Sequence, residues 1–282
     1  MDHSGKAPFK LIMALIGCSY TQARSIVGAP IRDPGKLDDV IKALRTEKKS
    51  GKPKPVGLDW PNNFKSLTIK GLGREFANYV VNDRGFSKND IDRLADDYLL
   101  KYTYTGPWKY RLIFPIVKDE LLFGWTGRII PSGGDKARYK SLSHHIDRAD
   151  TQDGIVAPIN IRSLLLFYDQ IKYGGNTLVI TEGPFDALKL DYYGKKFNIR
   201  ATCIFGAAPS TEQLYALSQL RSMYTNFVLL LDNDKKMNAL SVESKLFLVD
   251  IKIRQLPEGV EDPGDMTKKQ IESFAVVLRE AV

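Results

Sequence analysis

From residue 177 onward, short apolar runs alternate with stretches that carry the signals of helices. The pattern predicts strands over residues 177–181, 201–205, 227–231 and 248–253. It predicts helices ending near 193, spanning 211–224 and 237–246, and beginning near 267, with Ser210 and Gln213 forming a capping box. Strands and helices in alternation are joined by right-handed crossovers, so we expect an α/β fold with a mostly parallel sheet covered on both faces.

The part of the chain before this region has a different pattern. Residues 111–117 and 121–130 are rich in Ile, Leu, Phe and Trp and flank a three-residue polar turn, which predicts a β-hairpin. Residues 74–98 predict two helices separated by Asp83-Arg84-Gly85, the second capped by Ser87 with Asp90 three residues on. We therefore expect an α+β subdomain ahead of the parallel sheet.

The first 55 residues predict three short helices, at 8–17, from about 19 to 28 and at 36–47. Residues 48–55 contain four lysines and no apolar residue that could anchor them, which is typical of a flexible linker; a contact with nucleic acid is the alternative. The predicted organisation is a helical segment with a basic linker (1–55), a basic α+β subdomain (56–173) and an α/β domain with C-terminal helices (174–282).

The composition limits the class of protein. No run of residues reaches the roughly 18 apolar residues that a membrane span needs, and the polar start is unlike a signal peptide, so we expect a cytoplasmic protein. Cys18 and Cys203 lie far apart and belong to no CxxC pair, which argues against a complete zinc site or a disulfide framework. The formal net charge of +8 favours a polyanionic partner such as nucleic acid.

Three carboxylates follow two of the predicted parallel strands. Glu182 comes directly after the strand at 177–181, and Asp232 and Asp234 follow the strand at 227–231. If these strands are neighbours, the three side chains converge at one edge of the sheet, where functional groups of open parallel sheets gather. Such a cluster suits Mg²⁺ or Mn²⁺ and, without His or Cys, does not suit zinc. The alternative is a polar turn after a buried strand and a helix cap.

The same residues resemble a known superfamily. Thr181-Glu182-Gly183-Pro184-Phe185-Asp186-Ala187 is similar to the strand-then-EGxxD signature of Toprim domains, and Leu231-Asp232-Asn233-Asp234 is similar to their DxD motif. On a helix, Asp186 would share a face with Glu182 four residues earlier. Gly183 would let the chain turn tightly between strand and helix. Toprim domains occur in primases, topoisomerases, nucleases and repair proteins, so these motifs alone do not choose the activity.

The flanking segments resemble DnaG-like primases of bacteria and phages. The similar segments lie in the family's order and span about residues 74–270: the helix pair at 76–90, the hairpin motifs at 110–116 and 123–129, the basic segment with a tyrosine at 137–141, and the LPxGxDPD-like stretch at 256–265. The last acidic pair departs from the pattern, because Asp262 and Asp265 are three residues apart where many members have a spacing of two.

The resemblance implies an enzyme that synthesises short RNA primers from NTPs on single-stranded DNA for replication. It implies that Glu182, Asp232 and Asp234 are the primary ligands of Mg²⁺ or Mn²⁺, with Asp186 and Asp262 supporting them. The residues expected to bind nucleic acid or NTP are Arg111, Arg128, Arg138, Tyr139 and Lys140. The alternative is a metal-dependent Toprim nuclease or a nucleic-acid-binding module.

Two modules of larger primases have no counterpart in the motifs of this sequence. No GxxxxGK[ST] motif is present, so we expect no ATP-driven helicase motor and a separate replicative helicase as partner. Residues 2–9 resemble the end of a zinc-binding module, but this sequence has no cysteines beside them that could bind zinc. These features favour a shortened chain or a stand-alone phage-type primase, acting in a bacterial or phage-infected cytosol.

Overall fold

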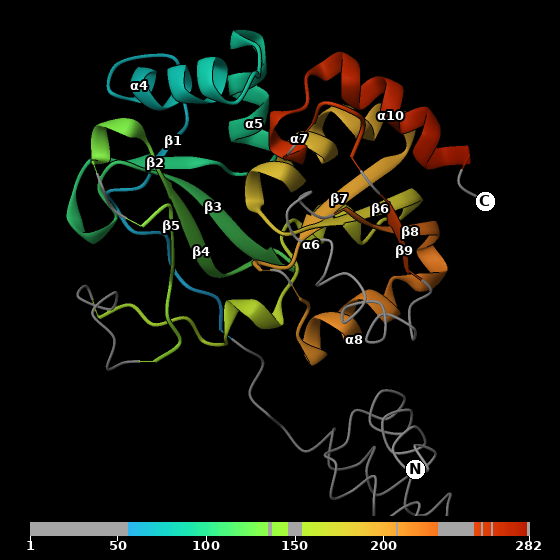
Figure 1. The fold of residues 1–282 in the computed structure, drawn as a ribbon. Helices are drawn as coiled ribbons and strands as arrows, with labels where there is room; N and C mark the ends of the chain where they lie inside the picture. The colour runs from blue at the N-terminus through green and yellow to red at the C-terminus, as the bar shows by residue number, and fades with distance from the viewer. Residues whose placement is uncertain are drawn as a thin grey trace, which may run out of the picture. The chain divides into compact units, whose positions relative to one another are not determined.

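The computed structural model describes residues 56–134, 137–145, 154–206, 208–230, 251–254, 256–260 and 262–280 (Figure 1). From residue 57 onward they belong to one compact unit. The helices predicted within 1–55 and at 237–246, and the basic linker, lie outside the described residues.

The first sheet is antiparallel and has five strands in the order β1-β2-β3-β4-β5. The strands are β1 (Lys65–Ser66), β2 (Lys101–Thr103), β3 (Arg111–Lys118), β4 (Leu121–Ile129) and β5 (Tyr139–Ser141). β3 and β4 form the predicted hairpin, with Leu112 opposite Arg128 and Phe114 opposite Thr126. The sequence pattern therefore predicted the centre of this sheet correctly, while the short strands β1, β2 and β5 were not anticipated.

Helices cover one face of the antiparallel sheet (Figure 1). They are α4 (Gly73–Asn78), the π-helical turn η1 (Tyr79–Asp83), the 3₁₀ turn η2 (Lys88–Asp90) and α5 (Ile91–Asp97). Phe76 of α4 packs on Tyr102 of β2 with ring centroids 4.8 Å apart. The predicted capping box is confirmed, since the Ser87 N–H donates to the Asp90 carboxylate at 2.9 Å. The 3₁₀ turn η3 (Gly106–Trp108) follows β2.

The second sheet is parallel throughout, in the order β7-β6-β8-β9. Its strands are β6 (Gly175–Thr181), β7 (Ile199–Cys203), β8 (Tyr224–Leu230) and β9 (Ile251–Arg254), joined or flanked by α7 (Pro184–Gly194), α8 (Thr211–Gln219) and α10 (Lys268–Glu280). The predicted capping box of Ser210 and Gln213 is present at the start of α8. The expected α/β fold, with an α+β subdomain ahead of a parallel sheet, is confirmed.

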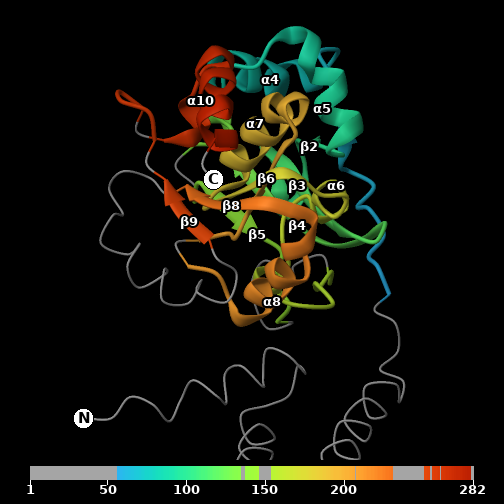
Figure 2. The ribbon, with the colours of Figure 1, turned by 90° about the vertical axis from the view of Figure 1, so that its right-hand side faces the viewer.

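The parallel strands bury both faces. Val179, Ala201 and Val228 belong to the hydrophobic cluster that includes residues of α7 and α10. Their neighbours along the strands, such as Leu178 and Leu229, belong to a second cluster that includes Leu217 of α8. Figure 2 shows α8 on the opposite side of this sheet from α7 and α10. Because both faces are covered, the strands are the continuous apolar runs seen in the sequence.

Short turns complete the described fold. They are η4 (Pro131–Gly133), η6 (Ile161–Ser163), α6 (Tyr168–Ile171), η7 (Lys195–Phe197), η8 (Arg221–Met223) and η11 (Pro263–Asp265). The last of these, between β9 and α10, lies against α7.

Helix α7 joins the two sheets into one core. Phe185, in its first turn, contacts Phe114 of β3 with ring centroids 4.9 Å apart and Tyr79 of η1 at 6.0 Å. All three side chains belong to one buried cluster with strands of both sheets. Helix α7, which connects β6 to β7 in the second sheet, therefore also packs against the first sheet.

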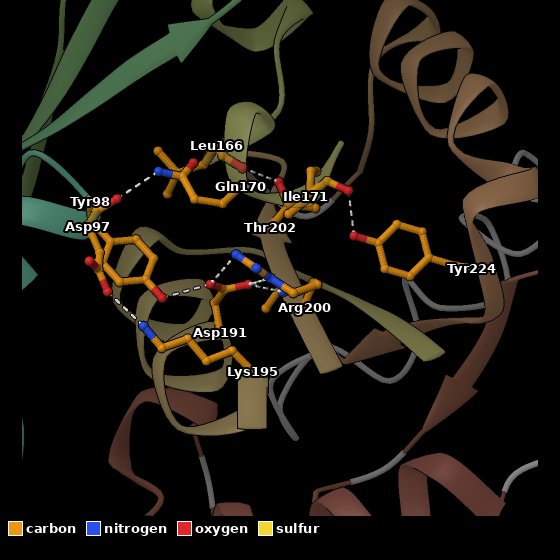
Figure 3. A network of polar contacts seen from close by, with 11 residues as sticks. Asp97, Tyr98, Leu166, Gln170, Ile171, Asp191, Lys195, Arg200, Thr202 and Tyr224 are labelled. Atoms are coloured by element: carbon orange, nitrogen blue, oxygen red, sulfur yellow. Dashed lines mark hydrogen bonds and ion pairs between the residues drawn. The ribbon is translucent and has the colours of Figure 1, made fainter. Parts of the chain in front are cut away.

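A polar network ties the same helix to both subdomains (Figure 3). Asp191 of α7 is fully buried and accepts hydrogen bonds from Tyr98 at 2.7 Å and from the Ala201 N–H at 2.8 Å. Its remaining partner is the guanidinium of Arg200 on β7. At the surface nearby, Lys195 pairs with Asp97 at 2.7 Å. The far end of α7 is thus fixed, which holds its first turn in a defined place.

Candidate active site

The strands that precede the predicted acidic residues lie side by side. β6 and β8 are hydrogen-bonded neighbours in parallel register, with Ile180 opposite Leu229. Glu182 follows β6 directly and is half-buried. Asp232 and Asp234 follow β8 but lie outside the described residues. The strand adjacency on which the convergence of these carboxylates depends is therefore confirmed, while the metal site itself stays a prediction.

Asp186 folds back onto Gly183, the residue just before α7. Its carboxylate accepts a hydrogen bond from the Gly183 N–H at 3.1 Å, which is one half of a capping box, since Gly183 has no side chain to accept a bond in return. α7 begins only at Pro184, so Glu182 lies before the helix and the expected sharing of a helix face by Glu182 and Asp186 is wrong. Gly183 has an ordinary extended backbone (φ −112°), but a Cβ there would come within 2.7 Å of Asp186 Oδ2. Glycine therefore leaves room for the Asp186 carboxylate, whose end would have to move away from any larger residue.

A second carboxylate meets Asp186 at η11. Asp262 caps this turn by accepting a hydrogen bond from the Gly264 N–H at 2.7 Å. A Cβ on Gly264 would lie 2.7 Å from Asp186 Oδ1 and 3.0 Å from Asp262 Oδ1, so both carboxylates face one point beside this glycine. Among the residues that the structure describes, no group of three or more His, Cys, Asp or Glu side chains could hold a metal ion. Two hard oxygen donors of neighbouring elements nevertheless fit the ligand type of Mg²⁺ or Mn²⁺.

Two arginines of the first subdomain share one acceptor on the side of the sheet that faces α7. The Tyr79 hydroxyl oxygen accepts hydrogen bonds from Arg84 Nε and Nη2, at 3.0 and 2.9 Å, and from Arg128 Nε at 3.1 Å. Arg84 also lies over the ring of Phe185, with its guanidinium carbon 4.9 Å from the centroid. Across from it, Asp265 of η11 is 3.8 Å away and largely exposed. Arg84 was not among the residues expected to bind nucleic acid or NTP, although its Arg-Gly-Phe-Ser segment is part of the family resemblance.

Tyr139 lies beside Arg128 and is close enough to Asp186 for the carboxylate to affect its pKa. Its ring is 5.1 Å from the guanidinium carbon of Arg128, its neighbour across β4 and β5. Burial, and after it the negative charge of Asp186, raises the pKa of the Tyr139 phenol. This hydroxyl therefore stays protonated near neutral pH and remains available as a hydrogen-bond donor.

The predicted basic residues of the hairpin are divided between the two faces of the sheet. Side chains alternate along a strand, so Tyr139 and Lys140 point to opposite faces. Arg128 pairs with Tyr139, whereas Lys140 pairs with Gly127 and donates to the Pro107 carbonyl at 3.3 Å. Lys140 also lies over the Trp108 ring at 4.7 Å. The structure thus brings Arg128 and Tyr139 to the side of α7 and leaves Lys140 on the other.

Arg111 lies on the same face as Lys140 and is buried. Its guanidinium donates to the carbonyls of Gly127 at 2.8 Å and Ala137 at 3.0 Å. Burial lowers the pKa of this guanidinium, and the two carbonyls join the hairpin to the segment before β5. Arg138, by contrast, is exposed. Of the five residues expected to bind nucleic acid or NTP, Arg111 has the contacts of a structural side chain.

A buried lysine, Lys189, lies beside the acidic residues, and no feature of the sequence indicated it. Lys189, on α7, is 2% exposed, and its ammonium donates to the Gly264 carbonyl at 2.8 Å. Burial lowers its pKa to about 8, against the opposing effect of nearby Asp265. Leu188 and Leu190 beside it are also buried, so the pattern around position 189 gave no reason to single it out.

Comparisons with known proteins give only distant likenesses. No protein-family model matches the chain, and no curated protein matches it. The primase fragment of the bacteriophage T7 primase-helicase protein is 14% identical with a TM-score of 0.49, over 83% of this chain and 84% of that one. A bacteriophage T7 lagging-strand DNA polymerase assembly with primase domains of two gp4 subunits, bound to an RNA/DNA hybrid and dTTP, gives 14% and 0.45, over 69% and 85%.

A bacterial primase domain gives a similar result. The RNA polymerase domain of the Mycobacterium tuberculosis primase DnaG, in complex with double-stranded DNA, is 16% identical with a TM-score of 0.46, over 76% of this chain and 66% of that one. These neighbours are primase domains, and the likeness to this chain concerns the fold alone.

Within the described residues, none of the helices combines the length and the apolar character that crossing a membrane requires.

Proposed function

We propose that this chain is the RNA-polymerase domain of a DnaG-like DNA primase, a nucleotidyltransferase that makes short RNA primers from NTPs on single-stranded DNA. One observation carries the proposal. Two arginines share the Tyr79 hydroxyl beside the acidic elements α7 and η11: Arg84 is 3.8 Å from Asp265, and Arg128 lies over Tyr139, whose phenol is close enough to Asp186 for that charge to raise its pKa. Cations from one subdomain and carboxylates from the other thus border one site, which suits the joining of phosphates.

The carboxylates would hold the divalent ions. The proposed ligands are Glu182, Asp232 and Asp234, with Asp186 and Asp262 in support. Bound Mg²⁺ or Mn²⁺ supplies charge neutralisation at the triphosphate and lowers the pKa of the attacking hydroxyl. The adjacency of β6 and β8 supports this set, because the ends of the strands that precede Glu182 and Asp232 in the sequence lie at one edge of the sheet.

The basic residues would position the nucleotides. Arg84 and Arg128 have guanidiniums fixed by Tyr79, so they lose little further freedom on gripping a phosphate. Tyr139 can donate a hydrogen bond or stack on a base. Arg138 would contact the template backbone from the segment before β5, and Lys140 would do so from β5, on the other face of the sheet. The further partners we propose are the RNA primer product and a separate replicative helicase.

The direct test is primer synthesis. The full chain is incubated with single-stranded DNA, labelled NTPs and Mg²⁺ or Mn²⁺, and new short RNA is the expected product. Asp232→Asn and Asp234→Asn should each abolish it at matched metal concentration without changing the thermal unfolding midpoint. Asp92→Asn, at an exposed position on α5, is the matched control. Shortening of the DNA without RNA synthesis would instead identify a Toprim-type nuclease, and neither product with intact DNA binding would identify a binding module.

A further inference from the structure

Lys189 lies one helical turn beyond Asp186, on the same side of α7. Its ammonium reaches out of the helix to the Gly264 carbonyl, 2.8 Å away, in the middle of η11. The two carboxylates that meet at Gly264 belong to Asp186 and Asp262, with Oδ1 atoms 2.7 and 3.0 Å from the position of a Cβ on this glycine. The ammonium and both carboxylates therefore converge on a single residue of the chain.

A third segment closes over the ammonium from the first subdomain. The turn after η1 brings Gly85, with a φ of +68°, so close that a Cβ there would lie 3.4 Å from Lys189 Nζ. Phe86 follows, with its ring centroid 5.9 Å from the same nitrogen. Arg84, just before, approaches Asp265 on the far side of η11. Lys189 is thus enclosed by α7, η11 and the turn that carries Arg84.

A buried ammonium loses its hydration, so it persists only where it has hydrogen-bond acceptors and opposite charges close by. Here the neighbouring negative charges are those of Asp186, Asp262 and Asp265, and they oppose the effect of burial on the pKa of Lys189. The same charges would otherwise attract a cation from solution. The lysine and a divalent ion therefore compete for one set of carboxylates.

We propose that Lys189 is a positioning residue that acts as a built-in counter-ion for the Asp186–Asp262 pair. Its ammonium holds η11 against α7 and weakens divalent-ion binding at this pair, so that tight binding is confined to the Glu182 side of the site. The proposal rests on the proposed function, because it concerns the metal occupancy of the same acidic site.

The test is a Mn²⁺ titration of the full chain by calorimetry, which needs no catalysis. Lys189→Met keeps the length and volume of the side chain and removes its charge. We expect this variant to gain an additional equivalent of Mn²⁺, or to bind Mn²⁺ about tenfold more tightly or better, since a unit charge a few ångströms away is worth at least that factor. Lys189→Arg, which keeps the charge, should retain the wild-type isotherm, and Lys196→Met, at an exposed position beyond α7, is the matched control.

A double variant locates the gain. Adding Asp186→Asn to Lys189→Met should remove the extra binding, because one of the two carboxylates is then neutral. In EDTA, Lys189→Met should unfold at a lower temperature than wild type, and added Mn²⁺ should restore more of that loss than it adds to wild type.

An isotherm of Lys189→Met that matches wild type, or a gain that survives Asp186→Asn, would overturn the counter-ion role. Failure of the proposed function has a different signature, in which wild type itself makes no primer while the variant still gains Mn²⁺ binding.

Discussion

The carboxylate of Asp191 receives two hydrogen bonds from the guanidinium of Arg200, from Nε at 2.8 Å and from Nη2 at 2.9 Å (Figure 3). Asp191 is on α7 and Arg200 is on β7, so the pair joins the helix to the strand that follows it. Both lone-pair sides of the carboxylate are used, since Tyr98 and the Ala201 N–H also donate to it. This arrangement fixes the second half of α7, beyond the first turn that carries Asp186.

Asp191→Ala should be strongly destabilising. It leaves the half-buried Arg200 guanidinium and the Tyr98 hydroxyl without their acceptor, which costs about 3–5 kcal/mol when one partner of a buried pair is removed. Urea unfolding at pH 7 measures the loss. Lys195→Ala, which breaks the exposed pair with Asp97, should cost less than about 1 kcal/mol. Equal losses in the two variants would contradict the central role of Asp191.

Arg128→Ala should mainly weaken ligand binding, whereas Arg111→Ala should mainly lower stability. Arg128 faces the site, so its loss should weaken binding of single-stranded DNA or NTP and flatten the salt dependence of DNA binding by about one unit of slope. Arg111 supports two backbone carbonyls, so its loss should lower stability by about 2–4 kcal/mol while the salt slope remains. Salt titrations and urea unfolding of both variants test this. A flattened slope for Arg111→Ala alone would reverse the assignment.

The parallel sheet was the part most accessible to sequence reasoning. Buried parallel strands are continuous apolar runs, and capped helices separate the runs before Glu182 and Asp232. The positions of the strands along the chain could therefore be predicted. Strand adjacency could not, because β6 pairs with β8 across an intervening strand in the sequence. The described strand ends differ from the predicted ones by up to three residues, as at Tyr224 of β8.

The candidate site was only partly accessible. Asp186 and Asp262 stood out through their motifs, and the structure brings them together at Gly264. Arg84 and Lys189 did not stand out, because their roles depend on contacts with residues far away in the sequence, such as Asp265 and Gly264. In the sequence, Arg111 and Lys140 looked equivalent to Arg128. The strand register decides on which face of the sheet each side chain lies, and the sequence of this hairpin does not reveal the register.

Tyr79→Phe should reduce activity more than stability. The hydroxyl holds two guanidiniums at hydrogen-bond distance from one oxygen, and without it the like charges of Arg84 and Arg128 should separate. We expect a higher KM for NTP, with a stability loss of about 1 kcal/mol from the missing hydrogen bonds. Tyr104→Phe, which removes a hydroxyl bonded to Glu75 in the same subdomain, is the control. An unchanged KM in Tyr79→Phe would show that the arginines are held by other contacts.

Asp90 gives a prediction for the pH dependence of stability. Its carboxylate accepts hydrogen bonds from the Tyr192 hydroxyl at 2.8 Å, the Tyr193 hydroxyl at 2.9 Å and the Ser87 N–H at 2.9 Å. Burial alone would raise the pKa of Asp90, but these hydrogen bonds outweigh burial and lower the pKa below its ordinary value of 3.8. The ionised form is therefore the one that stabilises the contact between η2 and α7.

Because the folded-state pKa of Asp90 lies below the unfolded-state value, the stabilisation is complete above the unfolded value. It is lost as the pH falls through the folded-state value. Asp90→Asn should thus cost about 1–3 kcal/mol in urea unfolding at pH 7, since charge-assisted hydrogen bonds are replaced by weaker or mismatched ones. The difference from wild type should shrink on going from pH 5 to pH 2.5. Asp92→Asn, at an exposed position on α5, should change stability by less than about 0.5 kcal/mol at either pH. A difference between wild type and Asp90→Asn that stays constant down to pH 2.5 would mean that the charge of Asp90 contributes nothing to the contact.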